Sequence, residues 1–170
     1  MEFKEYIKLT YKKLLFDSKI NESDSIIKLR EYSYEKYNLI GLPSLKSEEW
    51  KYTPINKFLK NNYLSHSIDK NETRSFDLTK FIIPNYNSFK IVLFNGKFLP
   101  KYSSKIENSK LFICDLKKFF KKDNSQLIDK NKYKFDEYFS KILTHKNSLC
   151  LLNNALINNG LYICIDENYI

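Results

Sequence analysis

Residues 41–55 read GLPSLKSEEWKYTPI, and they are the most specific part of a chain otherwise rich in Lys, Asn, Ile and Tyr. The stretch contains the only Trp of the chain and two of its four Pro. Gly41 can adopt a left-handed conformation that ends a helix, and Pro43 cannot continue one. Pro54 suits the start of a helix, where its missing N–H costs nothing. The stretch therefore predicts a corner between two helices.

The residues between these prolines predict a short helical turn that carries large rings. Glu48 and Glu49 suit the first turn of a helix, where the helix dipole favours negative charge. Trp50 and Tyr52 follow with amphipathic side chains. Because aromatic residues bury large areas and usually serve packing, we interpret Trp50 as the buried pin of a structural corner. The alternative interpretation is that Trp50 stacks on a ligand.

The sequence before the corner predicts two helices that pack together as a hairpin, and a third short helix is expected from Pro54. A cap-rich run, Asn21–Asp24, separates the first two helices. The positions expected to face the core are Phe3, Ile7, Tyr11, Leu14 and Leu15, then Ile26, Leu29, Tyr37 and Ile40, and finally Ile55, Phe58 and Leu59.

A polar run at residues 65–75 predicts a linker between a helical region, 1–64, and a mixed region, 76–170. The pair Asn95–Gly96 between apolar runs is typical of a hairpin with a type I′ turn. Strands are expected at residues 89–94, 97–99, 111–114 and 161–165, and helices at 115–120, 133–143 and 148–157, with Asp115 as a cap and a loop at 121–132. The apolar stripe of the helix at 133–143 comprises Phe135, Tyr138, Phe139, Ile142 and Leu143. The fold class expected is α+β.

Residues 161–165 read LYICI, which predicts a strand that is apolar on both faces and must be covered on each side.

The net charge of +9 raises the alternative of a nucleic-acid-binding module. Only Arg30 and Arg74 among the 29 basic residues are arginines, whereas specific readers of bases and phosphates use the arginine fork. The excess of Lys, Asn, Ile, Tyr and Phe also fits codon usage in an A/T-rich genome. We interpret the densest runs, Lys117–Lys118 and Lys121–Lys122, as solvated surface.

No catalytic, cofactor-binding or metal-binding residue is predicted. Cys114, Cys150 and Cys164 lie in apolar surroundings without a C-x-x-C motif, and we interpret them as small buried hydrophobes in a reducing cytosol. His66 and His145 have no acid or nucleophile beside them in sequence, so both are expected at the surface. The chain also lacks a phosphate-binding glycine loop and a nucleophile elbow, so we expect it not to be an enzyme.

No targeting or membrane segment is visible, because the longest apolar runs are far shorter than the ~18 residues that cross a bilayer. The N-terminus is amphipathic, but Glu2 and Glu5 do not fit the acid-poor pattern of a transit peptide. A cytoplasmic protein is expected.

Residues 41–53 resemble the G-P-x-x-K-x-E-x-W-K-Y-T signature near the N-terminus of SufD-type subunits of the SUF iron–sulfur cluster assembly complex. The matching positions are Gly41, Pro43, Lys46, Glu49, Trp50, Lys51, Tyr52 and Thr53. Two later segments resemble the same family in the same order: FNGKF at residues 94–98, and LNNA at residues 152–155 followed by Gly160 and the strand at 161–165.

The resemblance implies the N-terminal region of a scaffold subunit whose main body is a right-handed parallel β-helix, with this chain stopping about where that β-helix should begin. It implies a SufB-like paralogous subunit and a SufC-like ABC-type ATPase as partners, in a complex that handles iron–sulfur clusters and ATP. The family's proposed cluster-building residues lie in the β-helix, so no cofactor is expected in this region. The related SufB-type sister subunit remains an alternative, although the GLP-to-WKYT pattern favours the D-type.

Overall fold

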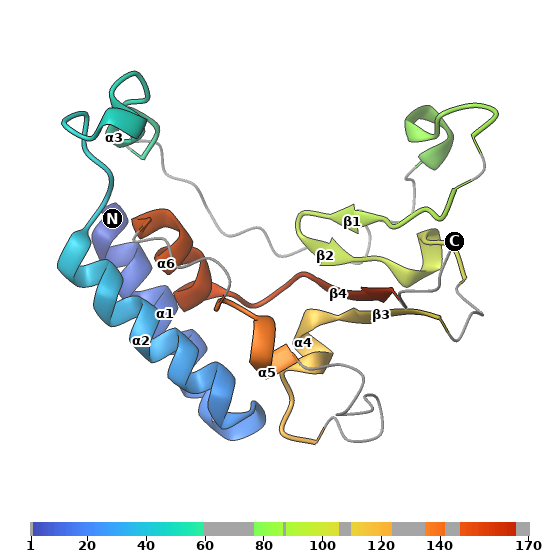
Figure 1. Cartoon of the computed structure of the whole chain (residues 1–170), viewed down its shortest axis with the longest axis horizontal. Helices are drawn as coiled ribbons and strands as arrows, with labels where there is room; N and C mark the ends of the chain where they lie inside the picture. The colour runs from blue at the N-terminus through green and yellow to red at the C-terminus, as the bar shows by residue number, and fades with distance from the viewer. Residues whose placement is uncertain are drawn as a thin grey trace. The chain divides into compact units, whose positions relative to one another are not determined.

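The computed structural model describes residues 2–59, 77–86, 88–105, 110–123, 135–141 and 147–165. Two long helices come first, and small antiparallel sheets and further helices follow, which confirms the α+β class (Figure 1). The chain divides into two compact units that interleave along the sequence. The first comprises Met1–Tyr63 and Lys118–Asn158, and the second comprises Leu64–Lys117 and Asn159–Ile170.

The predicted linker at residues 65–75 lies outside the described residues. The sequence places everything after residue 76 in one region, whereas the compact units assign residues 118–158 to the same unit as the N-terminal helices. The first unit is therefore completed by a segment from the second half of the chain.

Three helices form the core of the first unit: α1 (Phe3–Asn21), α2 (Asp24–Ile40) and α6 (Ser148–Leu156). Figure 1 shows α6 beside α1 and α2, and α2 packs more extensively against α6 than against α1. The buried apolar residues of these helices are Ile7, Tyr11, Ile26, Tyr37 and Ala155. The predicted hairpin of α1 and α2 is therefore part of a three-helix arrangement. The sequence did not predict that α6 packs against these two helices.

The two long helices are joined along one side by a stacked ring pair. The rings of Tyr11 and Tyr34 lie 3.7 Å apart between centroids, with planes inclined by 10°. Ile40, expected to face the core, is 50% exposed. This expectation is wrong because Ile40 is the last residue of α2, where the chain leaves the helix.

The chain leaves α2 at Gly41, as predicted. The Gly41 N–H donates to the Tyr37 carbonyl at 2.7 Å. Its φ of 74° and ψ of −167° lie in an extended region of positive φ that only glycine occupies readily, rather than in the left-handed helical region. Two short turns follow in the predicted places, η1 (Glu48–Trp50) and α3 (Ile55–Phe58), and Pro54 directly precedes α3.

Two further short helices are described. The helix α4 (Leu116–Phe119) follows the predicted cap, because the Asp115 carboxylate accepts from the Lys117 N–H at 2.8 Å. The helix α5 (Phe135–Tyr138) is much shorter than predicted. Ser140 has a φ of 61°, which is incompatible with a right-handed helix and ends it. The predicted positions Ile142 and Leu143 lie outside the described residues.

The second unit contains two antiparallel strand pairs. The first pair is β1 (Leu93–Phe94) and β2 (Lys97–Phe98). Asn95 and Gly96 between them have φ values of 47° and 77°, so the predicted type I′ turn is confirmed, although both strands are shorter than expected. Short turns flank this hairpin at η2 (Leu78–Phe81) and η3 (Pro100–Tyr102).

The second pair is β3 (Leu111–Asp115) and β4 (Leu161–Ile165), whose register runs from Leu111 opposite Ile165 to Asp115 opposite Leu161. The sequence predicted both strands. Ile163 and Ile165 are 46% and 59% exposed, so one face of β4 is not covered by the described chain, contrary to the expectation. None of the described helices combines the length and apolar character needed to span a membrane.

Candidate functional site

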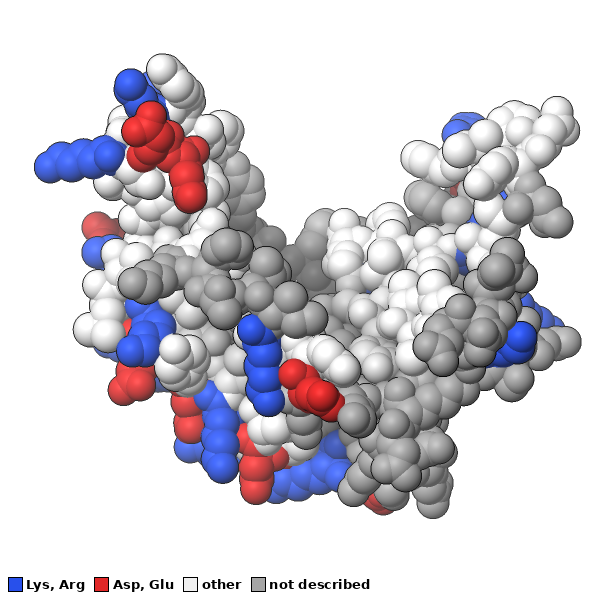
Figure 2. Space-filling model, in the orientation of Figure 1, with Lys and Arg blue, Asp and Glu red and all other residues white. Residues whose placement is uncertain are grey.

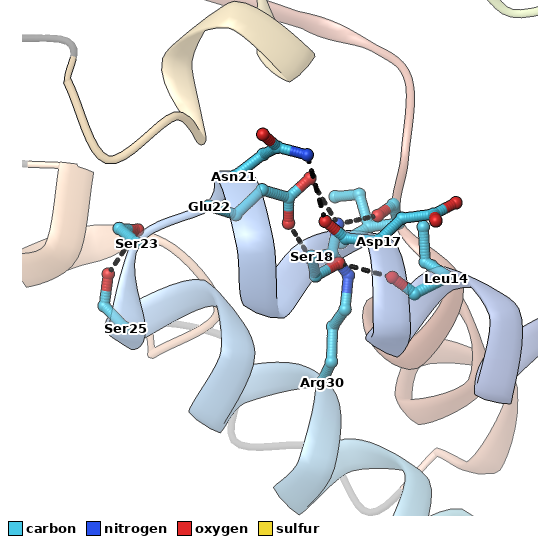
Figure 3. Close-up of polar contacts among 9 residues, drawn as sticks. Leu14, Asp17, Ser18, Asn21, Glu22, Ser23, Ser25 and Arg30 are labelled. Carbon is cyan, nitrogen blue, oxygen red and sulfur yellow. Dashed lines mark hydrogen bonds and ion pairs between the residues drawn. The ribbon is translucent and has the colours of Figure 1, made fainter.

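Arg30 is the most deeply buried charged side chain of the described residues, with no exposed surface. It projects from the middle of α2 towards the end of α1 (Figure 3). Its Nη1 donates to Ser18 Oγ at 2.9 Å and to the Glu22 carboxylate. Its Nη2 donates to the backbone carbonyl of Ile157 at 2.5 Å. One side chain therefore links three helices of the first unit.

The surroundings of this guanidinium are negative for two reasons. Ser18 lies in the last turn of α1, and Glu22 and Ile157 are the C-caps of α1 and α6. The C-terminal ends of helices carry partial negative charge and unpaired carbonyls. The Glu22 carboxylate adds a full charge. A buried cation needs such partners, and the planar fork of arginine carries more N–H donors, in a fixed geometry, than the compact ammonium of lysine.

An aromatic ring closes one side of the cluster. The guanidinium carbon lies 5.6 Å from the centroid of the buried Phe120 ring, within the range of cation–π attraction. The Phe120 carbonyl accepts from the Ser23 N–H at 2.8 Å, and the ring of Phe139 meets that of Phe120 edge-on at 6.2 Å. We call the set Ser18, Glu22, Arg30, Phe120 and Ile157 the Arg30 junction.

The segment after Phe120 is also bonded to the turn between α1 and α2. The backbones of Lys121 and Glu22 form an isolated antiparallel β-bridge. The backbone N–H of Lys122 donates to the Asn21 carbonyl at 3.1 Å, and its Nζ donates to the Lys19 carbonyl at 3.2 Å. These bonds attach the segment after Phe120 to the turn between α1 and α2, and Glu22 belongs both to this turn and to the buried ion pair.

Two polar atoms beside the junction lack a hydrogen-bond partner within the described part of the chain: Arg30 Nε and Ser33 Oγ. Ser33 lies one turn after Arg30 on the same helix and is 1% exposed. Most buried hydroxyls in proteins are bonded, so Ser33 is an exception. By contrast, the Ser18 hydroxyl both accepts from Arg30 and donates to the Leu14 carbonyl at 2.6 Å.

Sequence reasoning missed the Arg30 junction, because it treated Arg30 only as part of the net charge. A signal was present. Ile26, Arg30, Ser33 and Tyr37 follow one another at spacings of a helical stripe, and all of them are buried. The rarity of arginine in a lysine-rich chain, together with its place on the core stripe, indicates a buried ion pair.

The corner at residues 41–55 differs from its prediction in one respect. Trp50 is only partly buried and Tyr52 is 87% exposed. The expectation of a fully buried pin is therefore wrong, because no other described element packs extensively against this turn. The turn is instead closed by its own backbone, with the Thr53 N–H donating to the Trp50 carbonyl at 3.0 Å.

The three cysteines have different environments. Cys114 is buried and Cys164 is partly buried, but Cys150 on α6 is exposed, so the interpretation as a buried hydrophobe is wrong for Cys150. Cys114 and Cys164 share a face of the β3–β4 pair, because their register partners are Tyr162 and Phe112.

Of the other residues considered in the sequence analysis, those that the structure describes are not gathered into a metal site. Among the residues with described placement, no group of three or more His, Cys, Asp or Glu side chains could hold a metal ion. His66, Arg74 and His145 lie outside the described residues. Both pairs of lysines, at 117–118 and 121–122, are exposed, as predicted.

Among the described residues, three side chains have shifted pKa values. Burial raises the pKa of Tyr11, with a further contribution from Glu31, and burial also raises the pKa of Tyr37. Hydrogen bonds from the Thr79 side chain and backbone lower the pKa of Asp77 at the start of η2. Burial is the largest cause at both tyrosines, so their pKa shifts reflect packing.

The Arg30 junction consists of a buried ion pair, backbone carbonyls and a ring, which suits the fixing of chain segments rather than the transformation of a substrate. It fixes the carbonyl of Ile157, just before the segment that leads through Gly160 into β4.

In the comparison with protein families, the family described as the SufBD protein N-terminal region matches residues 2–170. Comparisons with curated proteins and with solved structures give no match. Because the family match extends over nearly the whole sequence, the chain belongs to the SufBD N-terminal-region family, which works in the SUF system of iron–sulfur cluster assembly.

Proposed function

We propose that the chain is the N-terminal region of a SufD-like scaffold subunit, which acts with a SufB-like paralogue and a SufC-like ABC-type ATPase in the cytoplasm. The observation that carries the proposal is the family match over residues 2–170. The finer assignment to the D-type rests on the GLP corner that precedes Trp50. Gly41 ends α2 there, and η1 and α3 follow directly.

In this proposal the region performs no chemistry of its own and binds no cofactor. Its part is to hold the first strands of the scaffold in place. The Arg30 junction supports this part, because it binds the carbonyl of Ile157 at the end of α6, a few residues before β4.

We further infer that β4 leads into a β-helix. Two features support this inference. In the described part of the chain β4 pairs on one edge only, with β3, and the side chains of Ile163 and Ile165 remain about half exposed. An apolar strand with a free edge and an uncovered face is suited to continuation by further strands.

The proposal is tested by grafting. The chain replaces the N-terminal region of the SufD-type subunit in a bacterium that depends on its SUF system, and a second graft replaces the corresponding region of the SufB-type subunit. We expect the SufD-type graft to restore growth and cluster loading of an apo-ferredoxin, and the SufB-type graft not to do so.

A matched control carries Lys28→Ala, an exposed position on α2, and should behave as the unaltered graft. Activity of the SufB-type graft alone would assign the chain to the sister subunit. Failure of both grafts, with both proteins folded and bound to the ATPase, would contradict the scaffold proposal.

A further inference from the structure

An apolar groove of about 520 Å³ lies in the second unit, and neither the family nor the Arg30 junction accounts for it. One wall comes from residues 78–86 and the other from residues 88–93 beside β1. Its large side chains are open to solvent: Phe81 and Ile83 are both 71% exposed, and Tyr86 is 65% exposed. Soluble proteins rarely expose contiguous apolar patches of this kind without a binding role.

The wall of the groove beside β1 is an extended segment whose backbone N–H and C=O groups lie alternately towards the hairpin and away from it. The extended segment before β1 bonds to residues 99–104 through its even-numbered positions. The N–H and C=O of Lys90 bond to Ser104, and the C=O of Val92 accepts from the Leu99 N–H at 2.9 Å. Successive residues of an extended chain direct these groups to opposite sides. The N–H and C=O of Ile91 and Leu93 are therefore directed away from the hairpin.

Within the described ranges, no strand pairs with this outer edge. Ile91 and Leu93 also line the groove. Main-chain donors and acceptors in a row, with an apolar groove alongside, are the two components of recognition by strand addition, in which backbone bonds give affinity and pockets receive side chains.

The charge around the groove selects the partner. Lys90 lines it, and Lys80 is an exposed residue of η2 between Leu78 and Phe81, which line the opposite wall. Other described lysines of the second unit lie at positions 97, 101, 105, 110 and 117, whereas its described acids are Asp77 and Asp115. Both acids already accept hydrogen bonds, from Thr79 and Lys117. In Figure 2 the surface over residues 77–86 is mostly uncharged, with lysine atoms in blue.

We propose that the outer edge at Ile91 and Leu93 binds an extended segment of a partner protein in which apolar residues alternate with acidic ones. The partner's backbone would pair with Ile91 and Leu93, its apolar side chains would enter the groove, and its carboxylates would face Lys80 and Lys90. This inference does not depend on the proposed function.

Three other occupants fit less well. A small molecule would be poorly enclosed, because three large side chains of the groove, Phe81, Ile83 and Tyr86, are more than half exposed. A lipid surface would leave the backbone groups of the edge without hydrogen bonds. A second copy of the chain would bring the same lysines against Lys80 and Lys90, and like charges at a contact oppose association.

The test uses the full chain and two fluorescent synthetic peptides, one in which Val alternates with Glu and one in which Val alternates with Lys. Fluorescence polarisation should show saturable binding of the Glu peptide, with at least about tenfold weaker binding of the Lys peptide. The position that decides the mode is Ile91, because its N–H faces outwards and is not used by the hairpin.

The deciding comparison is Ile91→Pro against Ile91→Ala. Proline removes the outward N–H but keeps more apolar surface than alanine, so side-chain contact alone would make the proline variant bind at least as well. Strand addition predicts the opposite order, with the proline variant weaker by about tenfold. Circular dichroism spectra that match the wild type establish that both variants are folded.

An independent variant, Ile83→Asp, changes a side chain that is 71% exposed and should also weaken binding of the Glu peptide without unfolding the chain. Equal binding by the Ile91 variants, equal binding of both peptides, or no binding of the Glu peptide would overturn the proposal. Stronger binding to phosphatidylserine vesicles would overturn it in favour of a membrane, and a dimer abolished by Ile83→Asp would overturn it in favour of a second copy.

Discussion

The Arg30 guanidinium shows how a single buried charge organises its surroundings. Its partners are the Glu22 carboxylate, the Ser18 hydroxyl and the Ile157 carbonyl. Such a pair contributes little relative to a well-packed apolar replacement, but removing one partner leaves the other charge buried and unpaired. We therefore expect the junction to specify one arrangement of the helices more than to add stability.

Replacing Arg30 by Ala should lower the free energy of unfolding by about 3–5 kcal/mol, because the Glu22 carboxylate would lose its counter-charge in a buried site. Urea denaturation followed by circular dichroism measures the change. Lys28→Ala on the same helix is the control, and as an exposed substitution it should alter the stability by no more than about 0.5 kcal/mol. Similar effects of the two substitutions would show that the ion pair is not structural.

Two buried serines next to Arg30 form a matched pair for the same measurement, since both are 1% exposed. Ser18→Ala removes a hydroxyl with two partners and should cost about 1–2 kcal/mol. Ser33→Ala removes a buried hydroxyl that has no partner in the described chain, and it should be neutral or stabilise by up to about 1 kcal/mol. A larger loss at Ser33 than at Ser18 would contradict the bonding pattern.

At the scale of elements, signals that depend on near neighbours predicted the structure well. The Asn95–Gly96 turn, the Asp115 cap and the strand at Leu161–Ile165 all appear where the sequence places them. Each depends on the conformational preference of a few adjacent residues. Pairing between distant elements was not predictable in this way. The packing of α2 against α6 is fixed by complementary faces far apart in sequence, and no periodicity within either helix indicates its partner.

The same limit applies to the candidate site. The residues of the Arg30 junction come from α1, α2, the segment after α4 and the end of α6. Only the position of Arg30 on the core-facing stripe of α2 could be predicted from the sequence. The half-buried state of Trp50 was not readable, since it depends on which elements happen to lie against η1.

Gly41 and Gly160 both have positive φ values, and substituting them by alanine measures how much each position depends on glycine. Gly41 has a φ of 74° and open space where a Cβ would be added, so Gly41→Ala should cost only the backbone strain, about 1–3 kcal/mol. Gly160 has a φ of 149°, and a Cβ there would lie 3.2 Å from Leu116 Cδ2. Gly160→Ala should therefore cost more than Gly41→Ala in thermal or chemical denaturation. An equal or smaller cost at Gly160 would show that Leu116 moves aside freely.

At the scale of the whole molecule, the two compact units are not successive in sequence. The first takes Lys118–Asn158 from the second half of the chain, and the second takes Asn159–Ile170 back after it. Neither unit is complete until most of the chain is present. A division at residues 65–75 would separate α6 from the helices on which it packs.

A chain shortened to residues 42–170 should therefore lose the backbone protection of α6, because α1 and α2 are its packing partners. Hydrogen exchange measured by mass spectrometry reports this loss. The β3–β4 pair belongs to the second unit and provides the internal control, since its amides should stay protected in the same sample. Persistent protection of α6 in the shortened chain would contradict the interleaved arrangement.

The bond between Arg30 and the carbonyl of Ile157 spans 127 positions of the chain. On a ribosome that adds about 5–20 residues per second, the guanidinium emerges on the order of ten seconds before its last acceptor exists. Glu22 and Ser18 emerge before Arg30, so they can bond to the guanidinium in the nascent helix pair before Ile157 is present. The bond to Ile157 can form only after that residue has been synthesised, so the cluster is completed shortly before β4 is made.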